Sequence, residues 1–468
     1  MKSLFNRPSL LSIAMLTAIA ASPGLAHAED LLEVYQQARQ SDPVLAQAEA
    51  QKLATSEGVN QARAQLLPQI TGSYSYNQSH THSSSSQPYA TGSGDFQVFS
   101  VTSSSDDYGT TLRGQVDQTL VDFSKYANLK TSHSQADAQN EQYRATEQSL
   151  IVRVAQAYFD VLTANDNLSF AKAEEKALSK QLDQAQQRYE VGLSAITDVN
   201  EAKANHDAAV ANVINTKNAL DDAREALTQI TGKSFGTLET LREDLPMNPP
   251  SPNNQKAWVD KALAQNPQVL AQRYQVDAAE HSISAARAGH LPTLGASVVY
   301  SRNPGWSDLN SARYGGSIHT NSNRETTSVG LVLNIPIFSG GATQSRVRQS
   351  IYERDAANDL LEQNRRQVTR DTRNAFRSVV AGISEVEARR QAVISAKSAL
   401  DATQAGFEVG SRNIIDVLNG QQQLFQARSA YSLARHNFII NKLLLKQSSG
   451  DISYNDLKAV NALLVAPD

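Results

Sequence analysis

The sequence predicts an α+β membrane protein in which long α-helices and pairs of β-strands form an internal two-fold repeat. Three observations support this fold class. One Val-Gly turn occurs near residues 189–199 and again near 407–417. The spacing of apolar residues changes from a period of 3.6 to a period of 2 after one proline in each half. Two very long segments, 124–191 and 342–405, contain a single glycine and no proline between them, which is typical of long helices.

The N-terminal segment, residues 1–28, is predicted to be a signal peptide. It carries Lys2 and Arg7, then an apolar run, and ends in Ala26-His27-Ala28. The chain has no cysteine, which suits an exported envelope protein without disulfides. The net charge is −4, with lysine and arginine dispersed among acidic residues, and nothing indicates a nucleic-acid partner.

The repeat divides the chain into a first unit, 29–240, and a second unit, 255–450. Asp198 and Asp416 lie 218 positions apart (416 less 198), and the glycines that end the next helices, Gly232 and Gly450, have the same separation. A proline-rich linker, 241–254, joins the two units, and 451–468 is a C-terminal tail. One duplicated structural unit therefore accounts for most of the chain.

Each unit is predicted to begin with a helix that is broken once by an Asx-Pro step. These steps are Asp42-Pro43 and Asn266-Pro267, and the helices stop at Pro68 and Pro292.

A pair of strands follows each of these helices. Ile70, Gly72, Tyr74 and Tyr76 share one face, with small polar residues on the other. The same alternation recurs in 112–117, 294–301 and 328–335, as in the wall of a membrane β-barrel. From the strands alone, a soluble hairpin with one wet face is an equal alternative.

The polar stretches between the paired strands, 80–107 and 302–324, are predicted to be mobile surface loops. His80 and His82 lack a third ligand nearby, so we expect them to be solvated and predict no metal site.

The long helices carry a narrow apolar stripe that needs partner helices. Its members in the second unit are spaced mainly by seven: Leu361, Val368, Ala375, Val379, Val386, Val393 and Leu400. The segments 197–230 and 415–446 are the predicted antiparallel partners, which makes each Val-Gly turn the tip of a helical hairpin.

After the signal peptide no run of about 18 apolar residues is present, so a membrane-spanning role requires a closed β-barrel. One chain offers four strands, whereas the smallest closed barrels need about eight. Two chains would supply eight strands and three would supply twelve, so the sequence predicts an oligomer.

Four stretches in particular resemble the TolC family of outer-membrane efflux and type I secretion channels: 181–199, 289–294, 329–341 and 410–418. The resemblance covers both units. It implies a homotrimer with a 12-stranded β-barrel, four strands per chain, continued by a long α-helical coiled-coil tunnel, with an equatorial region near the linker and tail. It further implies an outer-membrane location extending into the periplasm and no cofactor.

The same resemblance implies passive conduction of drugs or secreted polypeptides. The implied partners are outer-membrane lipid, a periplasmic adaptor (membrane fusion) protein and an inner-membrane pump or ABC transporter.

The resemblance also assigns site residues. Asp416 matches an aperture aspartate, and Asn419 stands where a second carboxylate is expected. Thr197, Asp198 and Arg412 match residues that hold the entrance closed, and Phe407 replaces a tyrosine at a gate contact. The predicted adaptor-docking residues are Val191, Gly192, Leu193, Val409, Gly410 and Ser411. The alternative is structural: both aspartates cap or begin helices, and Arg412 is a solvated charge.

Two other function classes compete with a channel. An enzyme is disfavoured because the chain lacks cysteine, His-Glu-x-x-His, Gly-x-Ser-x-Gly and a phosphate-binding loop. A periplasmic coiled-coil adaptor or adhesin also explains the signal peptide, the long helices and the repeat. It does not explain the four alternating strands.

Overall fold

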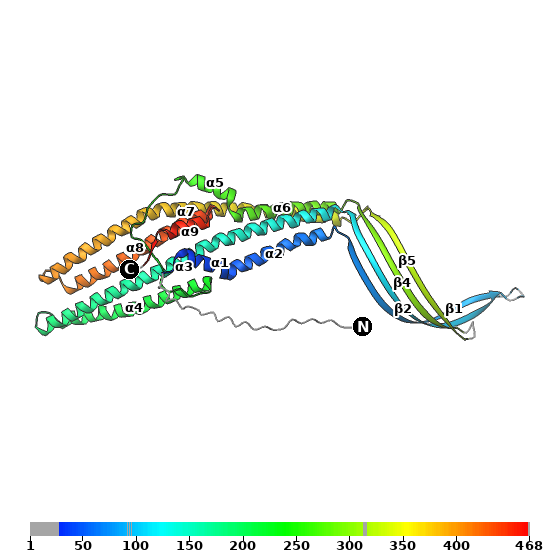
Figure 1. The fold of residues 1–468 in the computed structure, drawn as a ribbon, viewed down its shortest axis with the longest axis horizontal. Helices are drawn as coiled ribbons and strands as arrows, with labels where there is room; N and C mark the ends of the chain where they lie inside the picture. Colours follow the sequence, from blue (N-terminus) through cyan, green and yellow to red (C-terminus); the bar gives the residue numbers. More distant parts are fainter. Residues whose placement is uncertain (1–27, 91, 93, 95, 312–315, 467–468) are drawn as a thin grey trace, which may run out of the picture.

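The computed structural model describes residues 28–466 except 91, 93, 95 and 312–315 (Figure 1). The predicted signal peptide therefore lies outside the described residues apart from Ala28. The molecule is elongated, with the helices toward one end and the long strands at the other.

The first half of the chain contains α1 (Leu31–Ser41), α2 (Pro43–Ala64), β1 (Gln69–Ala90), β2 (Phe96–Val121), α3 (Phe123–Glu190) and α4 (Ile196–Thr231). The second half contains β3 (Thr240–Leu241), α5 (Gln255–Gln265), α6 (Pro267–Ala288), β4 (Thr293–Ser311), β5 (Gly316–Asn334), α7 (Ala342–Glu408), α8 (Ile414–Ser448), α9 (Tyr454–Asn461) and β6 (Leu464–Val465).

The two predicted helix breaks are confirmed. Asp42 and Asn266 are the N-caps of α2 and α6, and their side chains accept backbone N–H groups of the first turn. A proline follows each cap, where its missing N–H group costs no helical hydrogen bond.

The long strands form one antiparallel sheet in the order β1-β2-β4-β5. Ile70, Val116, Val298 and Val329 lie directly opposite one another across all four strands. The apolar faces expected from the four separate alternations therefore coincide on one face of the sheet.

The two predicted loops are wrong, because most of 80–107 and 302–324 is strand. In this extension Ser83 pairs with Ser103, with their Oγ atoms 2.9 Å apart, and His80 Nδ1 lies 2.7 Å from Asp106 Oδ1. The strands of this extension are joined by hydrogen bonds between backbone groups, and the protomer buries neither face of them. The sequence therefore has no need of a regular apolar alternation there, and without one the strands were not predicted. Within the described ranges, no group of three His, Cys, Asp or Glu side chains is placed to hold a metal ion.

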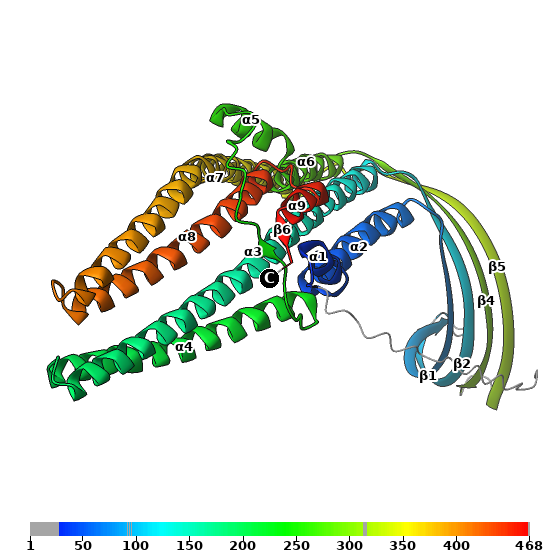
Figure 2. The same ribbon diagram turned by 60° about the vertical axis from the view of Figure 1, so that its left-hand side comes forward.

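The helices α3 and α7 are 68 and 67 residues long and pair with α4 and α8 as two hairpins (Figure 2). The predicted antiparallel partners are thus confirmed. The predicted stripe on α7 is also confirmed, since Val368, Val379, Val386 and Leu400 are buried. Both hairpin tips lie at the end of the molecule remote from the sheet.

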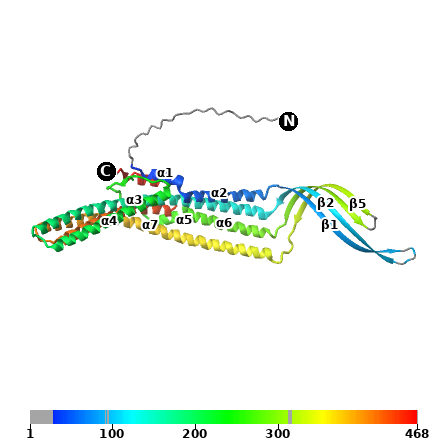
Figure 3. The same cartoon turned by 90° about the horizontal axis from the view of Figure 1, so that it is seen from below.

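Figure 3 shows α2, α3, α6 and α7 side by side in a layer that leads into the strands. The order of these helices matches the strand order, because each helix is joined to one strand. No helix in the described part of the chain combines the length and the apolar content needed to cross a bilayer.

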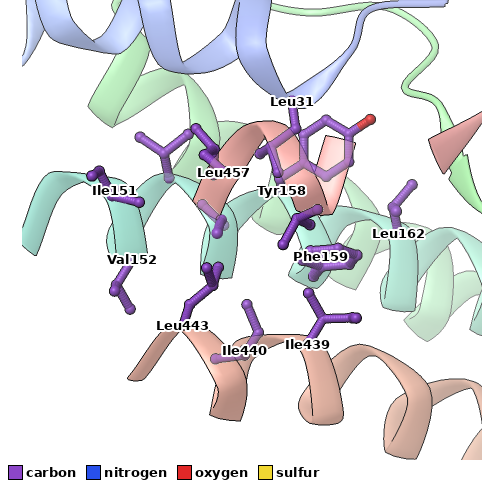
Figure 4. Packing of buried hydrophobic residues seen from close by; sticks show 14 of the residues in the cluster. Leu31, Ile151, Val152, Tyr158, Phe159, Leu162, Ile439, Ile440, Leu443 and Leu457 are labelled. Carbon is purple, nitrogen blue, oxygen red and sulfur yellow. The ribbon is translucent and has the colours of Figure 1, made fainter. Parts of the chain in front are cut away.

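The main core lies where the hairpins meet the linker and the C-terminal segment (Figure 4). Tyr158 and Phe159 of α3 pack with Ile439 of α8 and Leu457 of α9. The Tyr158 hydroxyl donates to the carbonyl oxygen of Glu239 at 2.9 Å, which satisfies the buried phenol. β3 and β6 pair beside this core, so the predicted linker and tail fold together.

Candidate functional site: the paired hairpin tips

The first hairpin turns on Gly192, whose φ of 78° lies in the left-handed region that favours glycine. Gly192 N–H donates to the Tyr189 carbonyl at 2.9 Å, and Leu193 N–H donates to the Arg188 carbonyl at 2.8 Å. These two bonds form a Schellman cap, which satisfies the last carbonyl groups of α3.

The second hairpin turns in the same way on Gly410, with φ 76°. Gly410 N–H donates to the Phe407 carbonyl at 3.1 Å, and Ser411 N–H donates to the Gly406 carbonyl at 2.8 Å. The two tips therefore present the same backbone geometry with different side chains.

The predicted docking residues include three apolar side chains that the turns expose to solvent. Val191 is 69% exposed, Leu193 71% and Val409 81%. Apolar side chains grouped at the end of a molecule suit contact with another protein.

Asp198 and Asp416 occupy the third position of α4 and α8, and each helix begins one residue before its predicted start at 197 or 415. Neither aspartate is an N-cap. Ala195 precedes α4 without a side-chain cap, and the Asn413 side chain caps α8 by accepting Asp416 N–H at 2.8 Å. Both carboxylates lie in a first turn, where the helix dipole favours negative charge. The structure therefore excludes the two aspartates as helix caps, and it agrees with the alternative that each lies at the beginning of a helix.

Arg412 pairs with Asp416 one turn away, with Nη1 3.7 Å from Oδ2. The structure thus brings Arg412 to Asp416, and no contact of Arg412 with Asp198 is formed within the described protomer. A Cβ added to Gly406 would lie 2.8 Å from Arg412 Cγ, so glycine at 406 makes room for the arginine side chain. Thr197 and Asn419 are exposed.

Phe407 is half-buried and packs against a small apolar cluster drawn from both hairpins, formed by Leu178, Ala209, Ile414 and Leu418. Arg188 of α3 places its guanidinium carbon 4.7 Å from the centroid of the Phe407 ring. Arg188, Asn413 and Gly406 were missed by sequence reasoning. Only the Asx preference of N-caps offered a signal, for Asn413.

A polar seam joins the hairpins between these tips and the core. Thr163 Oγ1 of α3 lies 2.7 Å from His436 Nδ1 of α8. The Ser429 hydroxyl of α8 donates to Asn167 Oδ1 of α3 at 2.6 Å. Ser432 donates to Asp166 in the same seam. Burial, with a smaller contribution from the charge of Arg435, lowers the pKa of His436 to about 4. The seam therefore holds a neutral, buried imidazole at neutral pH.

A family model described as outer membrane efflux protein matches residues 34–233 and 258–451, which include both hairpins. The chain belongs to the outer membrane efflux protein family. It is 36% identical over 463 residues to the outer membrane protein TolC of Escherichia coli K12, covering 98% of this chain and 90% of that protein. It is 37% identical over 463 residues to TolC of Vibrio cholerae, covering 97% of this chain and 98% of that protein.

Solved structures share the fold of this outer membrane efflux protein. The outer-membrane channel OprN aligns with a TM-score of 0.71 at 17% identity, covering 90% of each chain. The outer membrane protein VceC of Vibrio cholerae aligns with a TM-score of 0.71 at 18% identity, covering 90% of this chain and 96% of that one.

The resemblance seen in the sequence is thus confirmed. The protein is an outer-membrane channel of the efflux and secretion class, and its family is one of channels, not enzymes. The adaptor or adhesin alternative finds no support among the relatives.

Proposed function

We propose that three copies of this chain form a closed 12-stranded barrel in the outer membrane, continued by a helical tunnel into the periplasm. The observation that carries this proposal is the four-stranded sheet β1-β2-β4-β5, in which the edge strands β1 and β5 each pair on one side within the described residues. These strands are 22 and 19 residues long, and unpaired backbone groups along such edges cost several kcal/mol each in lipid.

One face of the sheet has the composition expected of a lipid-facing wall. Ile70 is 78% exposed in the protomer, Tyr74 70%, Val329 77% and Leu331 71%, and all four lie on the same face. Light scattering of the detergent-solubilised protein tests the assembly, and a monomer would contradict it. Stepwise single-channel conductance in planar bilayers tests the pore.

The mature chain, in this proposal, is one unit used twice, 29–240 and 255–450, with the linker 241–254 and the tail 451–468 at the equator. The matching lengths of the paired elements support the duplication: α1 and α5 both have 11 residues, and α2 and α6 both have 22. The identical Schellman caps at the two tips support it as well.

The tips, we infer, form a gated periplasmic entrance in which Asp416 and Asn419 line the aperture. Thr197, Asp198 and Arg412 hold the entrance closed. Arg412 is 61% exposed on its side chain and only loosely paired at 3.7 Å, which leaves its planar fork free to bond Asp198 of a neighbouring copy. Replacing Arg412 by Ala is therefore expected to raise the resting conductance without changing the yield of trimer.

The exposed tip residues Val191, Leu193 and Val409, with Gly192, Gly410 and Ser411, are proposed to dock a periplasmic adaptor that is itself bound to an inner-membrane pump or ABC transporter. A relative at 29% identity over 443 residues, covering 94% of this chain and 88% of that protein, is the alkaline protease secretion protein AprF of Pseudomonas aeruginosa. Its name supports secreted polypeptides as one cargo class of this channel.

Photo-crosslinking residues at positions 193 and 409 test the docking site. They should capture an adaptor in cells, whereas the same residue at 214 should not, because Ile214 is 65% exposed but lies near the middle of α4. Equal capture from all three positions would contradict docking at the tips.

A further inference from the structure

The two hairpins meet close to their tips through one charged side chain and one aromatic ring. Arg188, in the last turn of α3, lies with its guanidinium carbon 4.7 Å from the ring centroid of Phe407, in the last turn of α7. Within the described residues no carboxylate lies at ion-pair distance from Arg188. The ring face is therefore the electrostatic partner of this guanidinium.

Both residues are held by the helix caps described above. The Arg188 carbonyl accepts Leu193 N–H, and the Phe407 carbonyl accepts Gly410 N–H. The two side chains thus extend from backbone that is already ordered, and their contact loses less conformational entropy than one between mobile loops.

The surroundings of the ring favour the contact. Phe407 is half-buried against the apolar cluster that contains Leu178, Ala209, Ile414 and Leu418, so part of the water around the ring is excluded. A phenyl ring has no hydroxyl to donate, but its face carries negative potential that attracts a cation, and a planar guanidinium stacks on it well.

We propose that Arg188 is a gate-positioning residue that latches the second hairpin, α7 and α8, against the first, α3 and α4, through the face of Phe407. The proposal rests on the proposed function of the tips as a gated entrance. An opening movement that carries the second hairpin away from the first would separate the guanidinium from the ring. The contact therefore favours the arrangement seen in the structure.

The expected size of the effect follows from the strength of cation–π contacts. Loss of one contact should favour opening by roughly two- to five-fold in each chain. If three chains must release together, the resting open probability should rise on the order of 10- to 100-fold, since the three factors multiply.

Planar-bilayer recordings of four single variants and one double variant test the latch. Phe407→Leu keeps an apolar side chain without the ring, and Arg188→Met removes the charge with little loss of length. Phe407→Tyr keeps the ring. Lys180→Met is the matched control, because it removes a positive charge from an exposed site on the same helix two turns away.

Phe407→Leu and Arg188→Met should each raise the resting open probability, and the double variant should rise no further than either single one, because both remove the same contact. Phe407→Tyr should not rise above the wild-type level, because the ring is kept, and Lys180→Met should stay at that level. All variants should give the wild-type yield of trimer.

Three results would overturn the latch. In the first, Lys180→Met raises the open probability as much as Arg188→Met, so the effect is only one of entrance charge. In the second, the two single effects multiply in the double variant, so the residues act independently. In the third, neither single variant changes the open probability while Arg412→Ala does, so the gate operates without this latch. No response to any variant, Arg412→Ala included, would instead refute the proposed gate itself.

Discussion

Replacing His436 by Gln should make the protein more resistant to acid. His436 is 4% exposed, and its Nδ1 lies 2.7 Å from Thr163 Oγ1 in the polar seam between α3 and α8. Its ring also lies 5.4 Å from that of Phe159, between centroids. Protonation would place a cation in this buried site, next to the positive charge of Arg435. A glutamine keeps a polar group for Thr163 but does not titrate.

The magnitude follows from the pKa of about 4 in the folded protein against an ordinary value of 6.5. Because the folded-state pKa is lower, the unfolded chain binds more protons between these values, and stability falls as the pH falls through this window. Between about pH 7.5 and about pH 4.5 the loss is about 2.5 kcal/mol per chain. Above the unfolded-state pKa the two proteins should differ little in their pH dependence.

Denaturant unfolding of the detergent-solubilised protein, followed by circular dichroism, measures this difference. The free energy of unfolding of each protein is determined at the two pH values, and the change in wild type is compared with that in His436→Gln. The comparison cancels the other titrating groups. Equal losses in both proteins would show that His436 does not titrate in this range and would refute the reasoning.

Three further outcomes are expected from other sites. Gly450→Ala should cost roughly 1–3 kcal/mol more than Gly192→Ala in thermal unfolding. The two glycines have similar positive φ values, 75° at Gly450 and 78° at Gly192. A Cβ at 450 would lie 2.7 Å from Asn266 Cα, whereas the space around 192 is open. Equal losses of stability in the two variants would contradict this close approach. Arg153→Met should destabilise the protein by about 3–5 kcal/mol at neutral pH, because it leaves the carboxylate of Asp42, which Arg153 bonds at 2.6 Å, buried and without its counter-ion. Burial alone would raise the pKa of Asp42, but the hydrogen bonds from Arg153 and from Leu45 N–H outweigh burial and lower that pKa. The loss of stability in Arg153→Met should therefore shrink in acid, where Asp42 becomes protonated. A loss that does not depend on pH would show that Arg153 acts through packing instead. In planar bilayers, a trivalent cation added from the periplasmic side should block the pore; Asp416→Ala should abolish this block and Asn419→Asp should strengthen it, and undiminished block in Asp416→Ala would place the aperture elsewhere.

Local signals predicted much of this fold. The Asx-Pro steps at 42 and 266 break helices because proline prevents continuation, and the Val-Gly steps end α3 and α7 because glycine adopts positive φ at little cost. The heptad stripe on α7 correctly identified its buried face. The outer halves of the strands gave no such signal, since mostly polar side chains on both faces leave little apolar alternation to detect.

The candidate site, like the fold, was predicted only in part from the sequence. The sequence by itself determined the two tips, their glycines and the exposed side chains beside them, because a helix cap is built from neighbouring residues. The Asn413 cap of α8 and the Arg412–Asp416 pair are local as well, because their partners lie three and four residues apart in the sequence. Only the tertiary structure decided that Arg188 meets Phe407 on another hairpin. Such contacts depend on the register between helices, which side-chain packing along their whole length sets and which no local preference encodes.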